Sequence, residues 1–181
     1  SDSNFDGSLT FVIGENGMDL ARKFGLPANQ IIKTGNWLGP LLVAAAENGV
    51  KKLLLFGYHG KLVKLSGGIF HTHHHLADGR IEILTSLAVR EGIAFDLIEL
   101  ISKSTSVENA LLALDSNHPE DVALIWGRMA NEIEIKSKSY VNRYLSSCME
   151  IGSVLFDRNR QIRWAGFHGL TQINSFGLLL K

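Results

Sequence analysis

The sequence has a single cysteine, Cys148, and only three prolines. One cysteine cannot form a disulfide within the chain, which is typical of a protein in a reducing compartment. So few prolines disfavour long disordered linkers. The 18 basic and 18 acidic residues cancel, and this balance argues against a surface that binds nucleic acid or acidic membranes in general.

Long hydrophobic runs are also missing. No run approaches the ~18 apolar residues of a membrane-spanning helix, and the first residues, SDSNFDGSL, lack the basic and apolar regions of a secretion signal. Apolar residues still make up 45% of the chain, enough for a sizeable core. We therefore expect a soluble, cytoplasmic protein with no membrane or nucleic-acid partner.

Apolar runs and turn residues alternate along the first half of the chain. The patterns predict strands at 9–13, 30–34 and 52–56, with helices at 18–24 and 41–48 between them. Strands and helices that alternate with short joins favour a parallel sheet. The expected fold is α/β, a Rossmann-like parallel sheet with helices on both faces.

The second half predicts a helical extension and then a C-terminal β-hairpin. Helical spacing marks 78–91 and a helix after Pro119, a capping box at 105–108 introduces another, and 95–101 fits either strand or helix. Strands at 149–156 and 161–166 flank a turn, whereas 169–181 gives no clear pattern. As domains we expect 1–8 as a flexible start or linker, 9–148 as the α/β domain, and 149–181 as hairpin and tail. The last segment belongs to the same domain or to a second one that begins outside this chain.

Most residues suited to chemistry follow the third strand. Five of the seven histidines lie between Leu53 and Arg80, in what we interpret as a long polar loop. Loops at the carboxyl ends of parallel strands are the usual ligand sites of open α/β sheets. Lysine and arginine side chains there would supply positive charge, and the histidines adjustable hydrogen-bond donors.

Three interpretations of this loop stay open. A metal site would use His71 and His75 at helical i,i+4 spacing, with His73 or Asp78 as the third ligand, although no zinc-protease glutamate accompanies them. A site for an anionic substrate uses more of the residues. In the third interpretation the histidines are satisfied loop residues with a structural role.

Glycine-containing turns follow the first two strands. The sequence GENG at 14–17 would aim helix N–H groups at a carboxylate or phosphate, or it is a tight turn that needs glycine. The sequence GNWLG at 35–39 leads into the next helix, with Asn36 as the expected N-cap. Trp37 would stack on a ligand ring or join the core.

The run GYHGKLVKLSGGIFHTHHHLADGR resembles the motif of the cobalt-precorrin-5B C(1)-methyltransferase family of anaerobic cobalamin biosynthesis. That motif reads GHxGKLxK, then GIFHTHSH, then ADxR. The segments FVIGENGMDLA and GNWLGPLL also resemble the preceding βα units of the family, so the likeness covers most of residues 9–92. Tyr58 stands where the family usually has histidine, and His74 where serine is common.

The resemblance implies methyl transfer from S-adenosylmethionine to a carbon of a cobalt-precorrin, a carboxylate-rich macrocycle. We assign catalytic roles to His73, His75 and Asp78, substrate binding to Lys61, Lys64, His71, Thr72 and Arg80, and cofactor binding to Gly14, Glu15, Asn16, Gly17, Gly35, Asn36 and Gly57, with no resident metal. Family members are longer, so an N-terminal domain of the same protein is expected as a partner, and a homo-oligomer is compatible with the pattern. A non-catalytic tetrapyrrole-binding module and a metal-dependent hydrolase are the alternatives.

Overall fold

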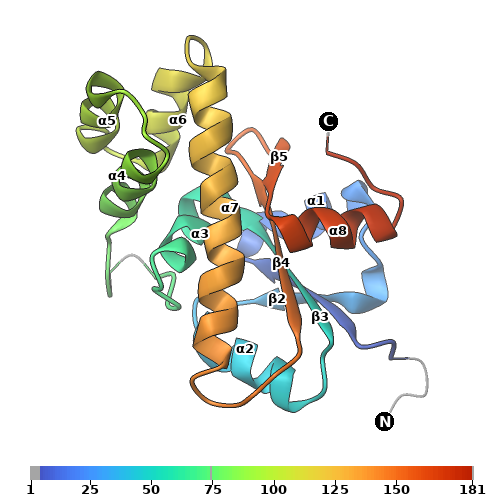
Figure 1. Cartoon of the computed structure of the whole chain (residues 1–181). Coiled ribbons are helices and arrows are strands. Elements are labelled where there is room, and N and C mark those ends of the chain that lie inside the picture. The colour runs from blue at the N-terminus through green and yellow to red at the C-terminus, as the bar shows by residue number, and fades with distance from the viewer. Residues whose placement is uncertain (1–4, 74, 181) are drawn as a thin grey trace.

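Four parallel strands and one antiparallel strand form a single sheet. A computed structural model describes residues 5–73 and 75–180 and orders the strands β2-β1-β3-β4-β5 (Figure 1). The strands β1 (Ser8–Ile13), β2 (Ile31–Thr34), β3 (Lys52–Tyr58) and β4 (Glu150–Phe156) run parallel, and β5 (Ile162–Ala165) pairs antiparallel with β4. The expected α/β fold with a C-terminal hairpin is therefore confirmed.

Helices cover both faces of this sheet, as expected. The helical elements are η1 (Glu15–Gly17), α1 (Met18–Phe24), η2 (Ala28–Gln30), α2 (Leu38–Glu47), α3 (His59–Ser66), α4 (Arg80–Arg90), α5 (Phe95–Ser102), α6 (Val107–Asp115), α7 (Pro119–Val141) and α8 (Phe167–Ser175). Apolar side chains of α1 and α8 pack on one face, and those of α2, α3 and α7 on the other. Among the described residues, no helix has the length and apolar character needed to cross a membrane.

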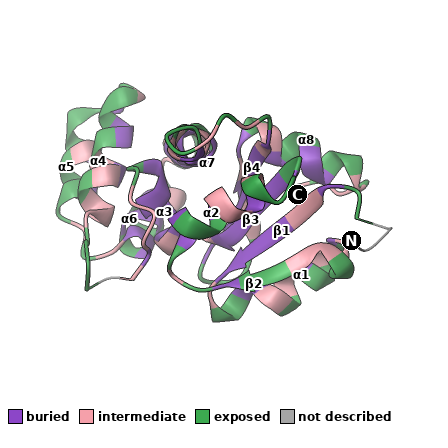
Figure 2. Cartoon of the chain, turned by 90° about the horizontal axis from the view of Figure 1, so that it is seen from below, coloured by how far each residue is buried: buried purple, intermediate pink, exposed green. Residues whose placement is uncertain are grey.

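The central strand β3 alternates between these two cores. Leu53 and Leu55 pack into the larger cluster, while Leu54 and Phe56 pack into the smaller one. All four side chains are at most 2% exposed, and the strands run buried through the middle of the molecule (Figure 2). The sequence of a strand that is covered on both faces is a continuous apolar run. For this reason the position of β3 could be predicted.

The helices α4, α5 and α6 form the expected extension beside one end of α7 (Figure 1). Residues 95–101, which fit two interpretations, form the helix α5. Its buried side chains Leu97 and Ile101 lie four residues apart, so they share the helix face that packs on the rest of the extension.

The polar loop expected after β3 is shorter than predicted, because α3 begins at once with His59. Apolar side chains in α3 recur at helical spacing, and Leu62 and Leu65 are fully buried. The glycine at position 60 allows close packing, since a Cβ there would lie 2.4 Å from the ring of Tyr58. The actual loop runs from Gly67 to Gly79.

The helix cap expected at Asn36 is absent. Trp37, not Asn36, occupies the N-cap position of α2, and it makes no capping hydrogen bond through its side chain. The Asn36 side chain instead accepts a hydrogen bond from the Thr72 hydroxyl in the histidine loop. The helix α4 also begins without a side-chain cap, since Gly79 precedes it.

The predicted capping box also begins one residue late. Ser106 is the N-cap of α6, and its hydroxyl accepts a hydrogen bond from the backbone N–H of Asn109 at 3.1 Å. Glu108 therefore does not reach back to the start of its helix. Its carboxylate is buried instead.

The helix α8 had no counterpart in the sequence prediction, because its cap comes from α7. The backbone N–H groups of His168 and Gly169 donate to the Glu134 carboxylate at 3.0 and 2.8 Å, and that of Phe167 donates to Asn131 Oδ1 at 2.9 Å. A third N–H group, from Ser153 of β4, also donates to Glu134 at 3.0 Å. One carboxylate thus joins α7, β4 and α8.

We expect Glu134→Gln to lower the free energy of unfolding by about 1–3 kcal/mol, because its NH₂ group would face a backbone N–H that needs an acceptor. Urea denaturation measures the change. The exposed Glu47 offers a matched control, and Glu47→Gln should stay within about 0.5 kcal/mol. Equal effects of the two substitutions would contradict the capping role.

Candidate functional site

A pocket of about 650 Å³ lies at the carboxyl ends of β1, β3 and β4. The chain passes from β1 to β2 on one side and returns to β3 on the other, and ligands of open α/β sheets bind where the strand order reverses in this way. Two pockets of similar size, about 700 and 790 Å³, lie beside β5 and between α7 and α8. We therefore choose the first pocket as the candidate site by its position and not by its volume.

The GENG turn forms one wall of this pocket. Gly14, Glu15 and Asn16 line it, and Gly14 has φ +90°, a conformation that favours glycine. Gly17 does not line it, because this residue is buried and an added Cβ would lie 2.6 Å from a β1 side chain. Lys61 of α3 lies opposite the turn, with its Nζ 3.1 Å from where a Cβ of Gly14 would be.

A buried chain of hydrogen bonds ends at another wall of the pocket, which Tyr58 and Glu108 line. The indole N–H of Trp126 donates to His59 Nδ1 at 2.8 Å, and His59 Nε2 lies 2.7 Å from Glu108 Oε2. Indole can only donate, so Nδ1 must accept, and the proton of a neutral His59 is on Nε2, where it points at the carboxylate. The Tyr58 hydroxyl donates to the same Oε2 atom at 3.2 Å.

Burial determines the protonation of His59 and Tyr58 in this hydrogen-bonded chain. It lowers the pKa of His59, although the neighbouring Glu108 acts in the opposite direction. Burial, followed by the negative charge of Glu108, raises the pKa of Tyr58 to about 12. Near neutral pH the tyrosine is therefore a hydrogen-bond donor and the histidine is uncharged.

Sequence reasoning missed His59 and Glu108 as site residues. The sequence pattern places His59 at the start of a loop, whereas it is fully buried in α3. The same pattern makes Glu108 a capping residue, but its partners lie 49 and 50 positions earlier in the chain. The only local signal was a histidine placed directly after a buried strand.

The histidine loop packs against the entry of α2. An isolated β-bridge joins His71 to Trp37, with ring centroids 4.8 Å apart. The rings of His71 and His73 are 6.3 Å apart, and those of His73 and His75 are 5.0 Å apart. Trp37 is 67% exposed, so the row of rings begins at an open aromatic side chain. His74 lies outside the described residues.

The cations of the loop region have internal partners. Lys64 is 1% exposed, and its ammonium donates to the carbonyl oxygen of His73 at 3.0 Å; burial lowers its pKa. Arg80 binds Asp78 through two hydrogen bonds of 2.6 and 2.8 Å. The guanidinium of Arg80 lowers the pKa of Asp78, so this carboxylate is not poised near neutral pH.

The second glycine turn lies apart from the first. Asn36 accepts from the Thr72 hydroxyl at 2.8 Å, and its carbonyl oxygen accepts from the Thr72 N–H at 2.9 Å. Gly35 and Asn36 therefore adjoin the histidine loop and do not line the pocket. Gly57 is buried within β3, where an added Cβ would lie 3.0 Å from Leu62.

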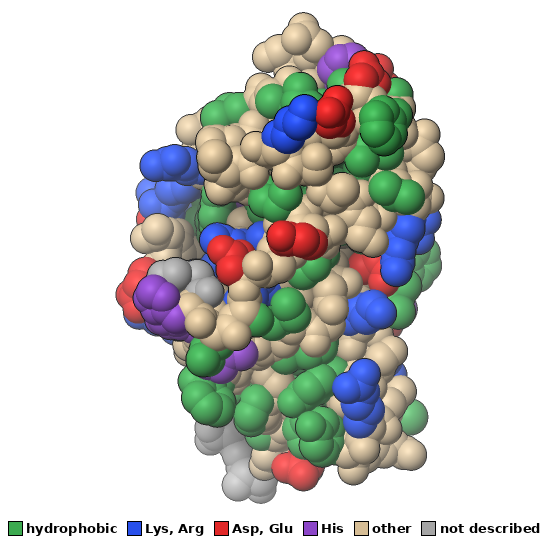
Figure 3. Space-filling model, turned by 90° about the vertical axis from the view of Figure 1, so that its left-hand side faces the viewer, with side chains coloured by type: hydrophobic (Ala, Val, Ile, Leu, Met, Phe, Trp, Pro, Cys, Tyr) green, Lys and Arg blue, Asp and Glu red, His purple; other side chains and the backbone are tan. Residues whose placement is uncertain are grey.

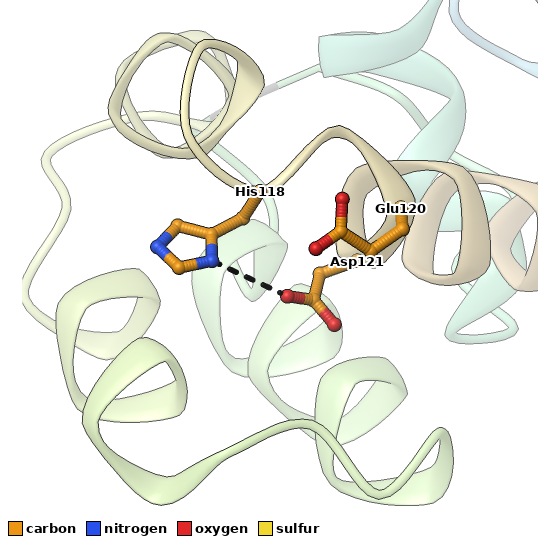
Figure 4. Close-up of side chains that lie close together, drawn as sticks. All are labelled: His118, Glu120 and Asp121. Atoms are coloured by element: carbon orange, nitrogen blue, oxygen red, sulfur yellow. Dashed lines mark ion pairs between the residues drawn. The ribbon is translucent and has the colours of Figure 1, made fainter.

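The histidine loop does not place its described residues as a metal-binding group. In residues 5–73 and 75–180, the group of three side chains with ligand atoms within 4.8 Å of one another is His118, Glu120 and Asp121 (Figure 4). These residues lie at the start of α7, where carboxylates stabilise the helix N-terminus. His118 Nδ1 is 3.6 Å from Asp121 Oδ2, an arrangement that this helix-end role accounts for.

The fold is an α/β fold, and the pocket lies where its strand order reverses. Figure 3 shows histidine side chains on the adjoining face, with hydrophobic side chains directly below them. The family model for the C-terminal domain of CbiD matches residues 71–166, more than half of the chain. The chain belongs to this family, and the resemblance stated from its motifs is confirmed.

Curated relatives match along the whole chain. A protein named cobalt-precorrin-5B C(1)-methyltransferase from Prochlorococcus marinus strain NATL2A is 84% identical over 181 residues, which are 100% of this chain and 48% of the relative. Proteins of the same name are 57% identical in strain CCMP1375 over 181 residues, again 48% of the relative, and 56% identical in strain MIT 9313 over 176 residues, 97% of this chain and 46% of the relative. The chain thus spans about half the length of these relatives. No solved structure matches.

The tautomer of His59 is testable by NMR. We expect a protonated Nε2 and a bare Nδ1 that persist from about pH 8 to below the ordinary histidine pKa of 6.5. Because folding lowers the pKa of His59 from its ordinary 6.5, the folded chain binds fewer protons than the unfolded chain in acid. This contribution to stability is intact above pH 6.5 and is lost as the pH falls.

Trp126→Phe should free Nδ1 and let His59 take up a proton at higher pH. Trp164→Phe is the control, since that ring lies 5.7 Å from His59 and makes no hydrogen bond to it. A histidine that titrates normally in the unsubstituted chain would show that Trp126 does not fix the tautomer.

Proposed function

We propose that this chain is part of a methyltransferase that transfers a methyl group from S-adenosylmethionine to a carbon of a cobalt-precorrin in cobalamin biosynthesis. The names of relatives up to 84% identical support this. The chain spans 48% of those relatives, so the proposal includes an N-terminal domain that completes the enzyme. It also includes a cytoplasmic location.

The observation that carries the proposal is that the pocket and the histidine loop adjoin. The helix α3 joins the two: Lys61 lines the pocket, and Lys64, one turn later, donates to the carbonyl oxygen of His73 in the loop. A methyl donor in the pocket would therefore lie beside a second ligand held by the loop. Methyl transfer needs such adjacent sites, because the donor and the acceptor carbon must be held in line.

The pocket suits the methyl donor. When bound, S-adenosylmethionine would supply an electrophilic methyl group on a positively charged sulfur. Lys61 and Arg158 line the pocket, and within the described chain neither forms an ion pair. Both are thus available for a ligand carboxylate. Gly14, Glu15 and Asn16 would contact the remainder of the donor.

The histidine loop suits a flat, carboxylate-rich macrocycle. Trp37 offers an exposed ring on which a planar ligand can stack. The N–H of His73 donates to His71 Nδ1 at 3.3 Å, so the proton of a neutral His71 is on Nε2. That buried atom has no hydrogen-bond partner among the described residues and is a candidate donor to a substrate carboxylate.

The remaining predicted roles are retained with changes that the geometry suggests. His73, His75 and Asp78 would orient the macrocycle or manage its protons, and Thr72 and Arg80 would contact it. Lys64 would hold the loop through the His73 carbonyl group rather than contact the substrate. Gly17 and Gly57 would support the pocket from beneath, and Gly35 and Asn36 would support the loop.

Binding of the methyl donor is tested by calorimetric titration of the chain with S-adenosylhomocysteine. Lys61→Met keeps the aliphatic length but removes the charge that would meet the ligand carboxylate, and we expect about 10-fold weaker binding, which is about 1.4 kcal/mol. Lys52→Met, at the opposite end of β3, is the control and should bind like the unsubstituted chain. No saturable binding by the unsubstituted chain would refute the donor site.

The macrocycle surface is tested with cobyrinic acid, a cobalt corrinoid with free carboxylates. Removing the exposed ring in Trp37→Ala should weaken binding by about 10-fold, because stacking area is lost. Phe167→Ala removes a ring of similar exposure, 71%, from α8 and should leave the affinity unchanged. An equal loss in both variants would argue against a stacking role for Trp37.

A further inference from the structure

The Glu108 carboxylate lies in the pocket wall as a buried negative charge. It is 5% exposed and lines the pocket. Its Oε2 atom accepts hydrogen bonds from His59 Nε2 and from the Tyr58 hydroxyl. Both donors are neutral, which leaves the charge of the carboxylate in place.

No lysine or arginine of the described chain forms an ion pair with this carboxylate. Among residues 5–73 and 75–180, no lysine or arginine nitrogen lies within 4.0 Å of the Glu108 carboxylate, whose partner in that range is His59. The indole of Trp126 keeps His59 Nδ1 an acceptor, so the ring does not become a cation there. Burial of a charge without a counter-charge is costly, and a ligand cation would remove that cost.

Two aromatic rings also line the pocket. Tyr58 and Phe156 both line the pocket, with ring centroids 6.3 Å apart. The faces of aromatic rings attract cations. A carboxylate in a pocket lined by two such rings is a chemically coherent receptor for an organic cation, and Lys61, which forms no ion pair within the described chain, supplies the complementary site for an anionic group at the GENG turn.

We propose that Glu108 binds the positively charged centre of the ligand in this pocket and thereby distinguishes the cationic methyl donor from its neutral thioether product. The inference rests on the proposed function for the identity of the ligand. His59 and Trp126 are positioning residues, because they act by holding the carboxylate rather than by contacting the ligand. The product lacks the positive charge on sulfur and therefore binds to the pocket more weakly than the methyl donor.

The test compares two ligands of nearly equal shape. Calorimetric titration with S-adenosylmethionine and with S-adenosylhomocysteine gives the ratio of their dissociation constants. For the unsubstituted chain we expect the charged ligand to bind about 10-fold more tightly, and for Glu108→Gln we expect the ratio to fall to about one. A merely structural role for Glu108 would weaken both ligands alike and leave the ratio unchanged.

Two further variants complete the design. Glu108→Asp keeps the charge but withdraws it by one methylene, so an intermediate ratio is expected; this variant decides the matter if Glu108→Gln does not fold. Glu132→Gln removes another buried carboxylate, which lies near Arg90 and Arg128 outside the pocket, and should preserve the ratio of the unsubstituted chain.

Each remaining outcome points to a different failure. If the unsubstituted chain binds both ligands equally well, the inference about Glu108 is overturned while the donor site stands. If Glu108→Gln and Glu108→Asp fold and keep the original ratio, the inference is likewise overturned. If the unsubstituted chain binds neither ligand, the donor site itself is refuted and the inference falls with it.

Discussion

The hydrogen-bonded chain from Trp126 through His59 to Glu108 joins the parts of this protein that form the pocket. It connects α7, α3 and α6 directly beyond the end of β3. The helical extension is therefore fixed to the carboxyl edge of the sheet through polar groups as well as through apolar packing. Because each member has a single arrangement of donors and acceptors that satisfies its neighbours, the network specifies how α6 sits over the pocket.

The elements that could be predicted are those whose signal lies within their own residues. The apolar run of β3 and the spacing of Leu97 and Ile101 in α5 are local patterns, and they indicated the sheet and the extension. The helix α8 escaped prediction because its first N–H groups are accepted by Asn131 and Glu134, more than 30 residues earlier. A cap supplied by another helix leaves no trace in the sequence of the helix that it caps.

The candidate site shows the same limit, because the sequence does not show which charged side chains are free to bind a ligand. Counting cations in the histidine region suggested several contacts to an anionic substrate, yet Lys64 bonds to the loop backbone and Arg80 bonds to Asp78. Of the predicted substrate-binding cations, Lys61 lines the pocket. GENG and the histidine loop both lie at the carboxyl edge of the sheet, and their roles in binding stay predictions. The sequence could not reveal which of these side chains form hydrogen bonds or ion pairs within the chain, because the tertiary fold determines their partners.

The strand order affects how the sheet can form while the chain is being synthesised on the ribosome. The strand β4 pairs along the whole of β3 but is encoded more than 90 residues later, after the entire helical extension. Until it emerges, the nascent sheet ends at β3, whose apolar residues and unpaired backbone groups form an edge prone to intermolecular pairing. The helix α3, which precedes β4, packs against β3 on one face in the interval. Apolar side chains on that face of β3 are therefore covered before its neighbour β4 has been synthesised.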